Sequence, residues 1–185
     1  MKIKLGIIGY GGMGKWHAQN APRAGVTIAA VCDIDEVKQK EAVDAGYKMY
    51  TTADELLKDP EVNTVILTVP NYRHKEMCIK AAEAGKNVIT EKPAAMNVQE
   101  LDEMEAACKK AGVFFTSHQN RRWDKDMLTV KKAYDDGLLG NIFTIESKLH
   151  SGNGYMHEWH LYKNPFMRIS RTCSTKKWTT TLRSS

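Results

Sequence analysis

Residues 9–14 read Gly9-Tyr10-Gly11-Gly12-Met13-Gly14 and directly follow the apolar run Ile3-Lys4-Leu5-Gly6-Ile7-Ile8. The spacing fits the pattern G-x-G-x-x-G, which is weak on its own. A β-strand before the turn and a helix after it are the context in which this pattern binds a dinucleotide. Asp33 ends the second apolar run, 24 residues after Gly9. An acidic side chain at that place can accept hydrogen bonds from ribose hydroxyls, so the stretch predicts a dinucleotide at the first turn.

Each glycine of this turn has its own expected role. Gly9 permits a tight turn, Gly11 leaves room for the pyrophosphate, and Gly14 lets the helix pack closely on the strand. We expect the pyrophosphate on the free N–H groups of a helix that begins near Met13. All six residues of the turn are therefore cofactor-binding candidates, namely Gly9, Tyr10, Gly11, Gly12, Met13 and Gly14. The alternative for the glycines is a purely structural turn.

Asp33 indicates which dinucleotide is preferred. Its carboxylate is expected to bind the adenosine ribose hydroxyls and to repel a 2′-phosphate, so NAD is favoured over NADP. Asp35 adds negative charge, and the first basic side chain after Asp33 is Lys38. Ile34 is counted with Asp33 among the residues that contact the cofactor. The alternative interpretation of Asp33 is an N-cap for the next helix.

The hydrophobic pattern predicts the fold class. Short apolar runs rich in β-branched residues alternate with segments of helical period, as in repeated βα units around a parallel sheet. Glycines that favour a left-handed cap follow four of the helical segments, at positions 25, 46, 85 and 112. We predict an α/β fold with a Rossmann-type doubly wound parallel sheet. Strands are expected at 3–8, 27–32, 48–50, 64–69, 87–90 and 113–117, and helices at about 13–24, 35–45, 53–58, 72–84, 97–111 and 124–136.

Composition excludes several classes of protein. The 185 residues are 42% hydrophobic and 26% charged, and no apolar run approaches the roughly 18 residues that span a bilayer. We therefore expect a cytoplasmic protein with no membrane segment and no secretion signal. The four cysteines form no C-x-x-C pair, and His157-Glu158-Trp159-His160 lacks the H-E-x-x-H spacing, so no metal site is predicted.

The net charge of +5 does not indicate a nucleic-acid-binding protein. Six basic residues and no acidic ones lie in the last 25 positions, and without them 21 basic residues face 22 acidic ones. No aromatic-interleaved basic surface accompanies this tail, so binding of nucleic acid is not expected.

Three further segments follow the fourth, fifth and sixth predicted strands. They are Thr68-Val69-Pro70-Asn71-Tyr72-Arg73-His74, Glu91-Lys92-Pro93 and His118-Gln119-Asn120-Arg121-Arg122-Trp123-Asp124. With the glycine-rich turn, they resemble the glucose-fructose oxidoreductase, inositol dehydrogenase and rhizopine-catabolism family, Gfo/Idh/MocA, over residues 1 to about 150. The resemblance implies an NAD-dependent oxidoreductase that transfers hydride between nicotinamide and a hydroxyl carbon of a sugar, cyclitol or related polyol.

The resemblance also implies roles for these residues. The lysine that matches Lys92 faces nicotinamide and substrate, so Lys92 is the expected catalytic residue, with Glu91 positioning it. An ammonium there can stabilise a developing alkoxide or relay the hydroxyl proton, and burial beside a cationic nicotinamide suits lysine to that task. The remaining cofactor-binding candidates are Val69, Pro70, Asn71, His74, Gln119 and Asn120, together with Glu91 and Lys92 themselves. A packing role stays open for His74, and turn capping for Gln119 and Asn120.

The end of the chain departs from the family pattern. Family members continue into a large open β-sheet domain in which a Gly-rich stretch precedes an Asp and a His, and neither is matched here. The run 142–149 could begin that sheet, but 9 of the 25 residues from Leu161 onward are Ser or Thr and no regular period persists. We expect a dinucleotide-binding domain at 1–120, a linker helix and first strand of a truncated α+β domain at 121–160, and an atypical tail at 161–185.

A change of reading frame is the leading explanation of the tail, with a divergent natural ending or a cloning artefact as alternatives. We expect the chain as given to be inactive, and the full-length form to be a homo-oligomer. The unpaired edge of the 142–149 strand would also favour self-association. The second function hypothesis is a non-catalytic dinucleotide-binding sensor or regulatory module.

Overall fold

The structure is a computed structural model that describes residues 2–148 and 179–182. It divides into two compact units, Met1–Arg122 and Trp123–Ser185, and each is described by itself. Among the described residues, no helix is long and apolar enough to cross a membrane.

The first unit is built on a six-stranded sheet of parallel strands in the order β3-β2-β1-β4-β5-β6. The chain runs outward through three strands, returns to the middle, and runs outward on the other side. This is the order of a doubly wound dinucleotide-binding sheet, as predicted. The strands are β1 (Lys4–Ile8), β2 (Thr27–Cys32), β3 (Met49–Tyr50), β4 (Thr64–Leu67), β5 (Asn87–Thr90) and β6 (Phe115–Ser117).

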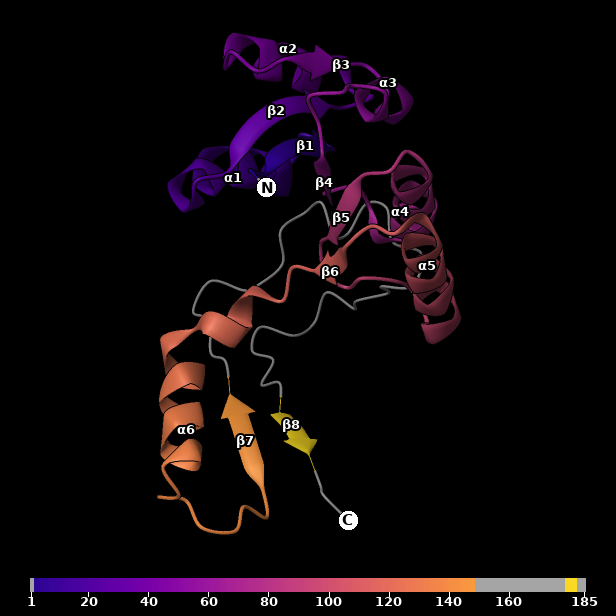
Figure 1. Cartoon of the computed structure of the whole chain (residues 1–185). Helices are drawn as coiled ribbons and strands as arrows, with labels where there is room; N and C mark the ends of the chain where they lie inside the picture. The colour runs from indigo at the N-terminus through magenta and orange to yellow at the C-terminus, as the bar shows by residue number, and fades with distance from the viewer. Residues whose placement is uncertain (1, 149–178, 183–185) are drawn as a thin grey trace, which may run out of the picture. The chain divides into compact units, whose positions relative to one another are not determined.

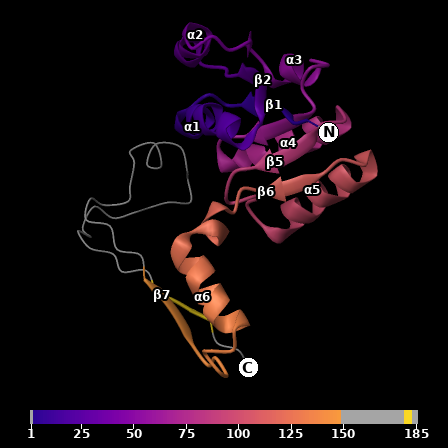
Figure 2. The same cartoon turned by 60° about the vertical axis from the view of Figure 1, so that its left-hand side comes forward.

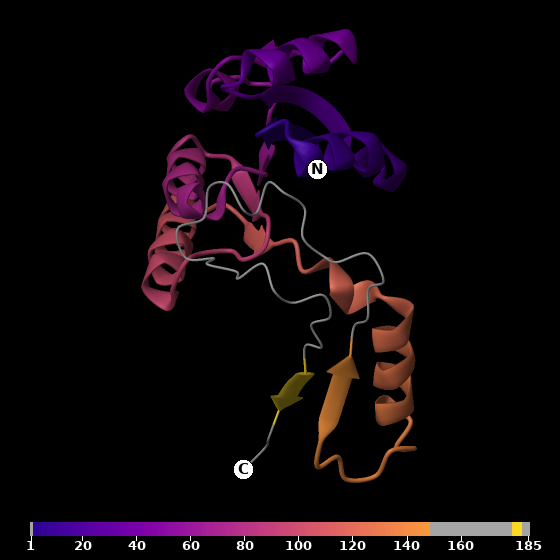
Figure 3. The same cartoon turned by 180° about the vertical axis from the view of Figure 1, so that it is seen from behind.

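Helices cover both faces of this sheet. In Figure 1, α1 lies to the left of the strands while α4 and α5 lie side by side to the right, and Figure 3 shows the same arrangement from behind. The helical elements of the unit are α1 (Gly12–Asn20), η1 (Ala21–Ala24), α2 (Glu36–Asp44), α3 (Ala53–Leu57), η2 (Asn71–Arg73), α4 (His74–Glu83) and α5 (Val98–Ala111).

Two helices differ from their predicted form. The segment expected as one helix at 13–24 is α1 followed by the 3₁₀ turn η1, because Pro22 has no N–H with which to continue the α-helical bonding. The segment expected at 72–84 begins with the 3₁₀ turn η2 before α4. The four predicted capping glycines all have positive φ, from 68° to 82°.

The sheet separates two apolar clusters because successive strand residues face opposite sides. Ile8, Val65 and Leu67 pack against α3, α4 and α5, while Ile7 and Ile66 pack on the side of α1 and α2. Strands buried on both faces explain the nearly continuous apolar runs of the sequence.

The second unit contains α6 (Lys125–Asp135), preceded by the 3₁₀ turn η3 (Asn120–Trp123) that spans the boundary. Figure 2 shows α6 together with β7 (Ile145–Lys148) and β8 (Thr179–Leu182), which pair antiparallel. No regular period was found in the sequence after residue 161, yet residues 179–182 form a strand, where a run of threonines, which are β-branched, suits that conformation. The same pairing covers one edge of β7, which was expected to be unpaired. Residues 157–160, which the sequence analysis considered and set aside as a metal-binding motif, lie outside the described residues.

Candidate functional site

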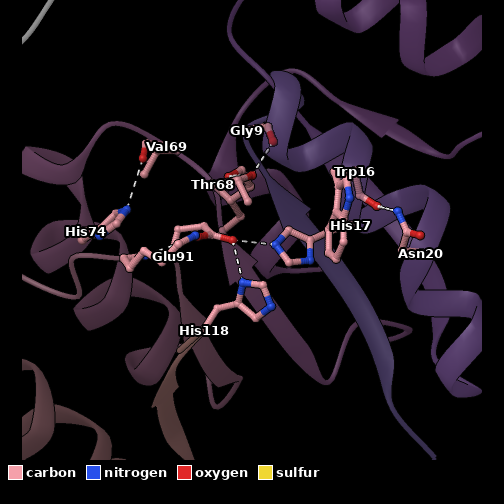
Figure 4. Close-up of polar contacts among 11 residues, drawn as sticks. Gly9, Trp16, His17, Asn20, Thr68, Val69, His74, Glu91 and His118 are labelled. Carbon is pink, nitrogen blue, oxygen red and sulfur yellow. Dashed lines mark hydrogen bonds and ion pairs between the residues drawn. The ribbon is translucent and has the colours of Figure 1, made fainter. Parts of the chain in front are cut away.

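The glycine-rich turn lies where the sheet order reverses, at the carboxyl ends of β1 and β4. The Thr68 N–H donates to the Ile8 carbonyl, and its hydroxyl donates to the carbonyl oxygens of Ile8 and Gly9 (Figure 4). Gly9 has a φ of +98°, and a Cβ there would lie 2.8 Å from the Thr68 carbonyl oxygen. A Cβ on Gly14 would overlap the Gly9 carbonyl oxygen. Both positions therefore require glycine for the turn to close.

Gly11 and Gly12 differ from these two glycines because their open side is empty. A Cβ at either position would meet no atom within 4 Å. Gly11 is the N-cap of α1, and its carbonyl accepts the first helical bond from the Lys15 N–H. The first N–H groups of a helix have no partner within it, so this end of α1 offers donors beside free space. Such a cradle fits an anionic group.

The Tyr10 side chain of the same turn points into the core. It is 4% exposed and packs edge-on against the ring of Tyr47. Only its main chain serves the loop, because its N–H donates to Oδ2 of Asp33 at 2.6 Å.

Asp33, after β2, joins the two loops at this edge of the sheet. Besides the Tyr10 N–H, its carboxylate accepts the Asp35 N–H on Oδ1 at 2.9 Å. The alternative interpretation of Asp33 as the N-cap of α2 is wrong, because Asp35 is that cap and accepts the N–H groups of Val37 and Lys38. Each carboxylate oxygen of Asp33 still has a lone pair for a further donor. Ile34 beside it is 90% exposed and contributes nothing to the core.

The segment after β4 runs through Val69 and Pro70 into η2, which begins at Asn71. His74, at the start of α4, is fully buried. Its Nε2 lies 3.1 Å from the Val69 carbonyl oxygen (Figure 4), and its Nδ1 lies 3.0 Å from that of Pro93. The ring therefore ties the loop after β4 to the loop after β5 through the main chain.

Glu91, directly after β5, is the centre of a buried polar cluster. Its Oε1 accepts hydrogen bonds from Nε2 of His17 at 2.7 Å and Nδ1 of His118 at 3.0 Å, as Figure 4 shows. Its Oε2 accepts from Nζ of Lys92 at 2.9 Å. The Lys92 side chain is 44% exposed, while that of Glu91 is 9% exposed. The peptide bond between Lys92 and Pro93 is cis.

This environment determines the charge of Glu91. Burial favours the neutral carboxyl group and would raise its pKa. The hydrogen bonds from His17 and Lys92, together with the positive charge of Lys92, outweigh burial and lower the pKa of Glu91 to about 2. Glu91 is therefore an anion at neutral pH and bonds the partly exposed ammonium of Lys92.

Gln119 and Asn120 follow β6 and are exposed. The Gln119 N–H donates to the Ser117 carbonyl, and Asn120 begins η3. The sequence-predicted residues thus follow β1, β2, β4, β5 and β6 at the carboxyl edge of the sheet, where open α/β sheets bind ligands. His74 and the Tyr10 side chain are buried beneath that edge.

The sequence reasoning missed the roles of His17 and His118. His17 is separated from Glu91 by 74 positions and lies on α1, three residues after the last glycine of the turn. His17, Glu91 and His118 offer three ligand atoms within 4.8 Å of one another, a set that could hold a metal ion. Their separations of 2.7 and 3.0 Å are also those of ordinary hydrogen bonds to a carboxylate.

The lowered pKa of Glu91 predicts acid sensitivity. Its ordinary value is 4.5 and its folded value about 2, so its ionised form contributes stability that is complete above pH 4.5 and is lost as the pH falls toward 2. We expect Glu91→Gln to be less stable at neutral pH but to lose about 2 kcal/mol less unfolding free energy than the wild type between pH 7 and pH 3. Urea unfolding at both pH values measures this difference, and equal losses in the two proteins would contradict it.

Comparison with known proteins gives three findings. The model of the Gfo/Idh/MocA oxidoreductase family, described as having an NAD-binding Rossmann fold, matches residues 3–119. The myo-inositol 2-dehydrogenase of Thermotoga maritima is 33% identical over 154 residues, which are 79% of this chain and 45% of that protein. An NAD-binding protein from Listeria innocua has a similar crystal structure, with a TM-score of 0.80 and 38% identity over 86% of this chain and 48% of that one.

A second crystal structure, of the WlbA dehydrogenase from Bordetella pertussis with NADH and UDP-GlcNAcA, has a TM-score of 0.73. It is 27% identical and covers 77% of this chain and 45% of that one. The chain thus spans slightly less than half the length of these relatives.

Proposed function

This chain belongs to the Gfo/Idh/MocA oxidoreductase family, and from that premise we propose that it forms the dinucleotide-binding part of an NAD-dependent dehydrogenase acting on a hydroxyl carbon of a polyol, sugar or cyclitol. One observation carries the proposal. A single edge of the sheet presents the open turn at Gly11, the carboxylate of Asp33 and the ammonium of Lys92. These are the groups that hold a pyrophosphate, hold a ribose and handle a hydroxyl proton.

The residues present fit a dinucleotide. The empty space at Gly11 and Gly12 lies against the N-terminus of α1, where a pyrophosphate is stabilised by main-chain N–H groups. Asp33 is held by two main-chain N–H groups, so its orientation is fixed before a ribose arrives. We assign the rest of the cofactor surface to Gly9, Met13, Gly14, Ile34, Val69, Pro70, Asn71, Gln119 and Asn120, with the Tyr10 main chain and His74 supporting it from beneath.

The catalytic role falls to Lys92. When bound, oxidised nicotinamide supplies the hydride acceptor. Removal of hydride from an alcohol carbon leaves an oxygen that must lose its proton, and Lys92 stabilises the developing negative charge or relays that proton. Glu91 holds the Lys92 ammonium at 2.9 Å and is itself too buried to reach a substrate.

Cofactor titration followed by a panel of polyols tests this function. The chain is titrated with NADH. The absorbance of NADH formed from NAD is then followed with inositols, aldoses and uronic acids in a chimera that joins residues 1–122 to the remainder of the Thermotoga maritima myo-inositol 2-dehydrogenase, because this chain spans 45% of that protein. Binding with substrate-dependent NADH formation supports a dehydrogenase. Binding with no formation under any substrate supports a non-catalytic dinucleotide-binding module, and absence of binding contradicts both.

We also propose that NAD is preferred over NADP, because Asp33 opposes a 2′-phosphate. We expect NADH to bind at least about 10-fold more tightly than NADPH, or about 1.4 kcal/mol. Asp33→Asn combined with Ile34→Arg should reverse this order, since it removes the negative charge and adds a phosphate partner at a position that is 90% exposed. Isothermal titration calorimetry with both cofactors measures the preference.

Ile34→Arg alone is the matched control, because it adds the same positive charge while leaving Asp33 and its bonds to the Tyr10 and Asp35 N–H groups intact. We expect Ile34→Arg alone to reduce the ratio of the affinities for NADH and NADPH without reversing their order. Equal affinity of the unaltered chain for NADH and NADPH would show that Asp33 does not meet the ribose.

A further inference from the structure

Glu91 gathers hydrogen-bond donors from three separate segments of the chain. His17 comes from α1, Lys92 from the loop after β5, and His118 from the end of β6. The two histidines share Oε1, while the lysine has Oε2. One oxygen of the carboxylate therefore bonds the two histidines, and the other bonds the lysine.

His17 has the shorter bond and is the more buried histidine. Its side chain is 7% exposed, against 25% for His118, and its Nε2 lies 2.7 Å from Oε1. Edge-on contacts with Trp16 and His118, at centroid distances of 5.1 and 4.8 Å, fix the plane of the ring. A buried donor in a fixed orientation bonds more strongly than an exposed one.

We propose that His17 is a positioning residue for Lys92: by holding Oε1 of Glu91, it turns Oε2 toward the ammonium. This inference rests on the proposed function, in which Lys92 handles the substrate hydroxyl. His17 also lies one turn beyond the glycines of α1, so the helix that carries the pyrophosphate cradle is bonded to the carboxylate that aims the lysine.

The physical reason lies in the exposure of Lys92. Its side chain is 44% exposed, and an exposed ion pair by itself barely offsets the entropy lost in ordering a long side chain. Such a pair is held in one geometry only if its carboxylate cannot rotate. Glu91 is prevented from rotating by the donors on its other oxygen, which compensate the burial of its charge.

The experiment uses two substitutions at position 17. In His17→Gln the amide nitrogen takes nearly the place of Nε2 and can still donate to Oε1. In His17→Leu an aliphatic side chain fills part of the space of the ring but has no hydrogen-bond donor. Ile7→Val serves as a control for lowered stability. Ile7 is buried in the apolar cluster on the side of α1 and α2, and it is not among the described partners of Glu91.

The readouts are two NMR signals of the 185-residue chain. The carboxyl ¹³C of Glu91, assigned by its loss in Glu91→Gln, reports the pKa of that group. The ¹⁵Nζ signal of Lys92, assigned by its loss in Lys92→Arg, reports an ammonium protected from exchange with water. Neither signal depends on cofactor or turnover.

We expect His17→Leu to raise the pKa of Glu91 by at least about one unit from its value of about 2 and to broaden or abolish the Lys92 ammonium signal. His17→Gln and Ile7→Val should keep both signals as in the wild type. NADH affinity should change by less than about 3-fold in all three variants, or about 0.65 kcal/mol.

Three results would overturn the inference. The first is a His17→Leu protein in which both signals stay unchanged. The second is a folded His17→Gln protein that behaves like His17→Leu, which would mean that ring packing rather than the donor matters. The third is stoichiometric binding of Zn²⁺ by the wild type that His17→Leu abolishes, which would make the three side chains a metal site. If the wild type does not bind NADH, the proposed function is contradicted, but the NMR signals of Glu91 and Lys92 still test the role of His17.

Discussion

Gly11→Val is expected to lower the affinity for NADH by at least about 100-fold, or about 2.7 kcal/mol, while the chain unfolds at nearly the wild-type temperature. A Cβ at Gly11 meets no protein atom within 4 Å, and the backbone there is extended rather than left-handed. Valine therefore fits without strain in the free protein. Its branched side chain fills the space in which a pyrophosphate would meet the first N–H groups of α1.

Gly14→Val provides the opposite result for comparison. A Cβ at Gly14 overlaps the Gly9 carbonyl oxygen, so α1 cannot pack on the turn without a shift of the main chain. We expect this variant to lose folded structure, and binding with it. Thermal unfolding followed by circular dichroism, with calorimetric titration of NADH, distinguishes the two effects. A folded Gly11→Val protein with unchanged NADH affinity would show that the pyrophosphate does not lie at this turn.

The fold of the first unit could be predicted because its strands are buried on both faces. The run 64–67 is buried throughout and apolar except for Thr64, and the glycines at 25, 46, 85 and 112 mark where helices end. These signals are local and survive in a single sequence. The strand order followed from one further rule, that a glycine-rich first turn belongs to a doubly wound sheet.

The polar cluster around Glu91 could not be predicted in the same way. His17 and His118 are about 100 positions apart, and only the folding of α1 and the end of β6 against the same strand end brings them together. Neither histidine has a metal-ligand spacing, and His118 was noticed only as the first residue of the segment after the sixth predicted strand. The sequence also did not show that Asp35, rather than Asp33, is the N-cap of α2.

The burial of individual side chains could not be predicted from the motifs either. Tyr10 and His74 occupy motif positions, yet the side chain of the first lies in the core and the second has no exposed surface. A motif fixes where the main chain passes, whereas the side-chain direction depends on packing. Lys92 is the reverse case, since the protein alone leaves it 44% exposed, and only a bound nicotinamide and substrate would bury it as the sequence analysis expects.

The largest expected effect on catalysis is that of Lys92→Ala. Because this chain spans 45% of the Thermotoga maritima myo-inositol 2-dehydrogenase, the assay uses a chimera that joins residues 1–122 to the remainder of that enzyme. General acid–base assistance contributes about 10²–10⁴-fold to rate. We therefore expect Lys92→Ala to lower kcat for polyol oxidation by that factor, while the Kd for NADH changes by less than about 3-fold.

Lys92→Arg separates the two roles open to Lys92. Arginine keeps the positive charge beside Glu91 but does not release a proton, since its pKa lies above about 12. Turnover close to that of the wild-type chimera would assign Lys92 to stabilising the alkoxide, and turnover as low as that of Lys92→Ala would assign it to proton relay. The 185-residue chain, assayed in parallel, should bind NADH with little turnover, because positioning a substrate is worth roughly 7–11 kcal/mol and this chain spans only 45% of the enzyme whose remainder completes the chimera. Rapid polyol oxidation by Lys92→Ala in the chimera would remove Lys92 from the chemistry, and rapid oxidation by the 185-residue chain alone would mean that it builds a complete pocket by itself.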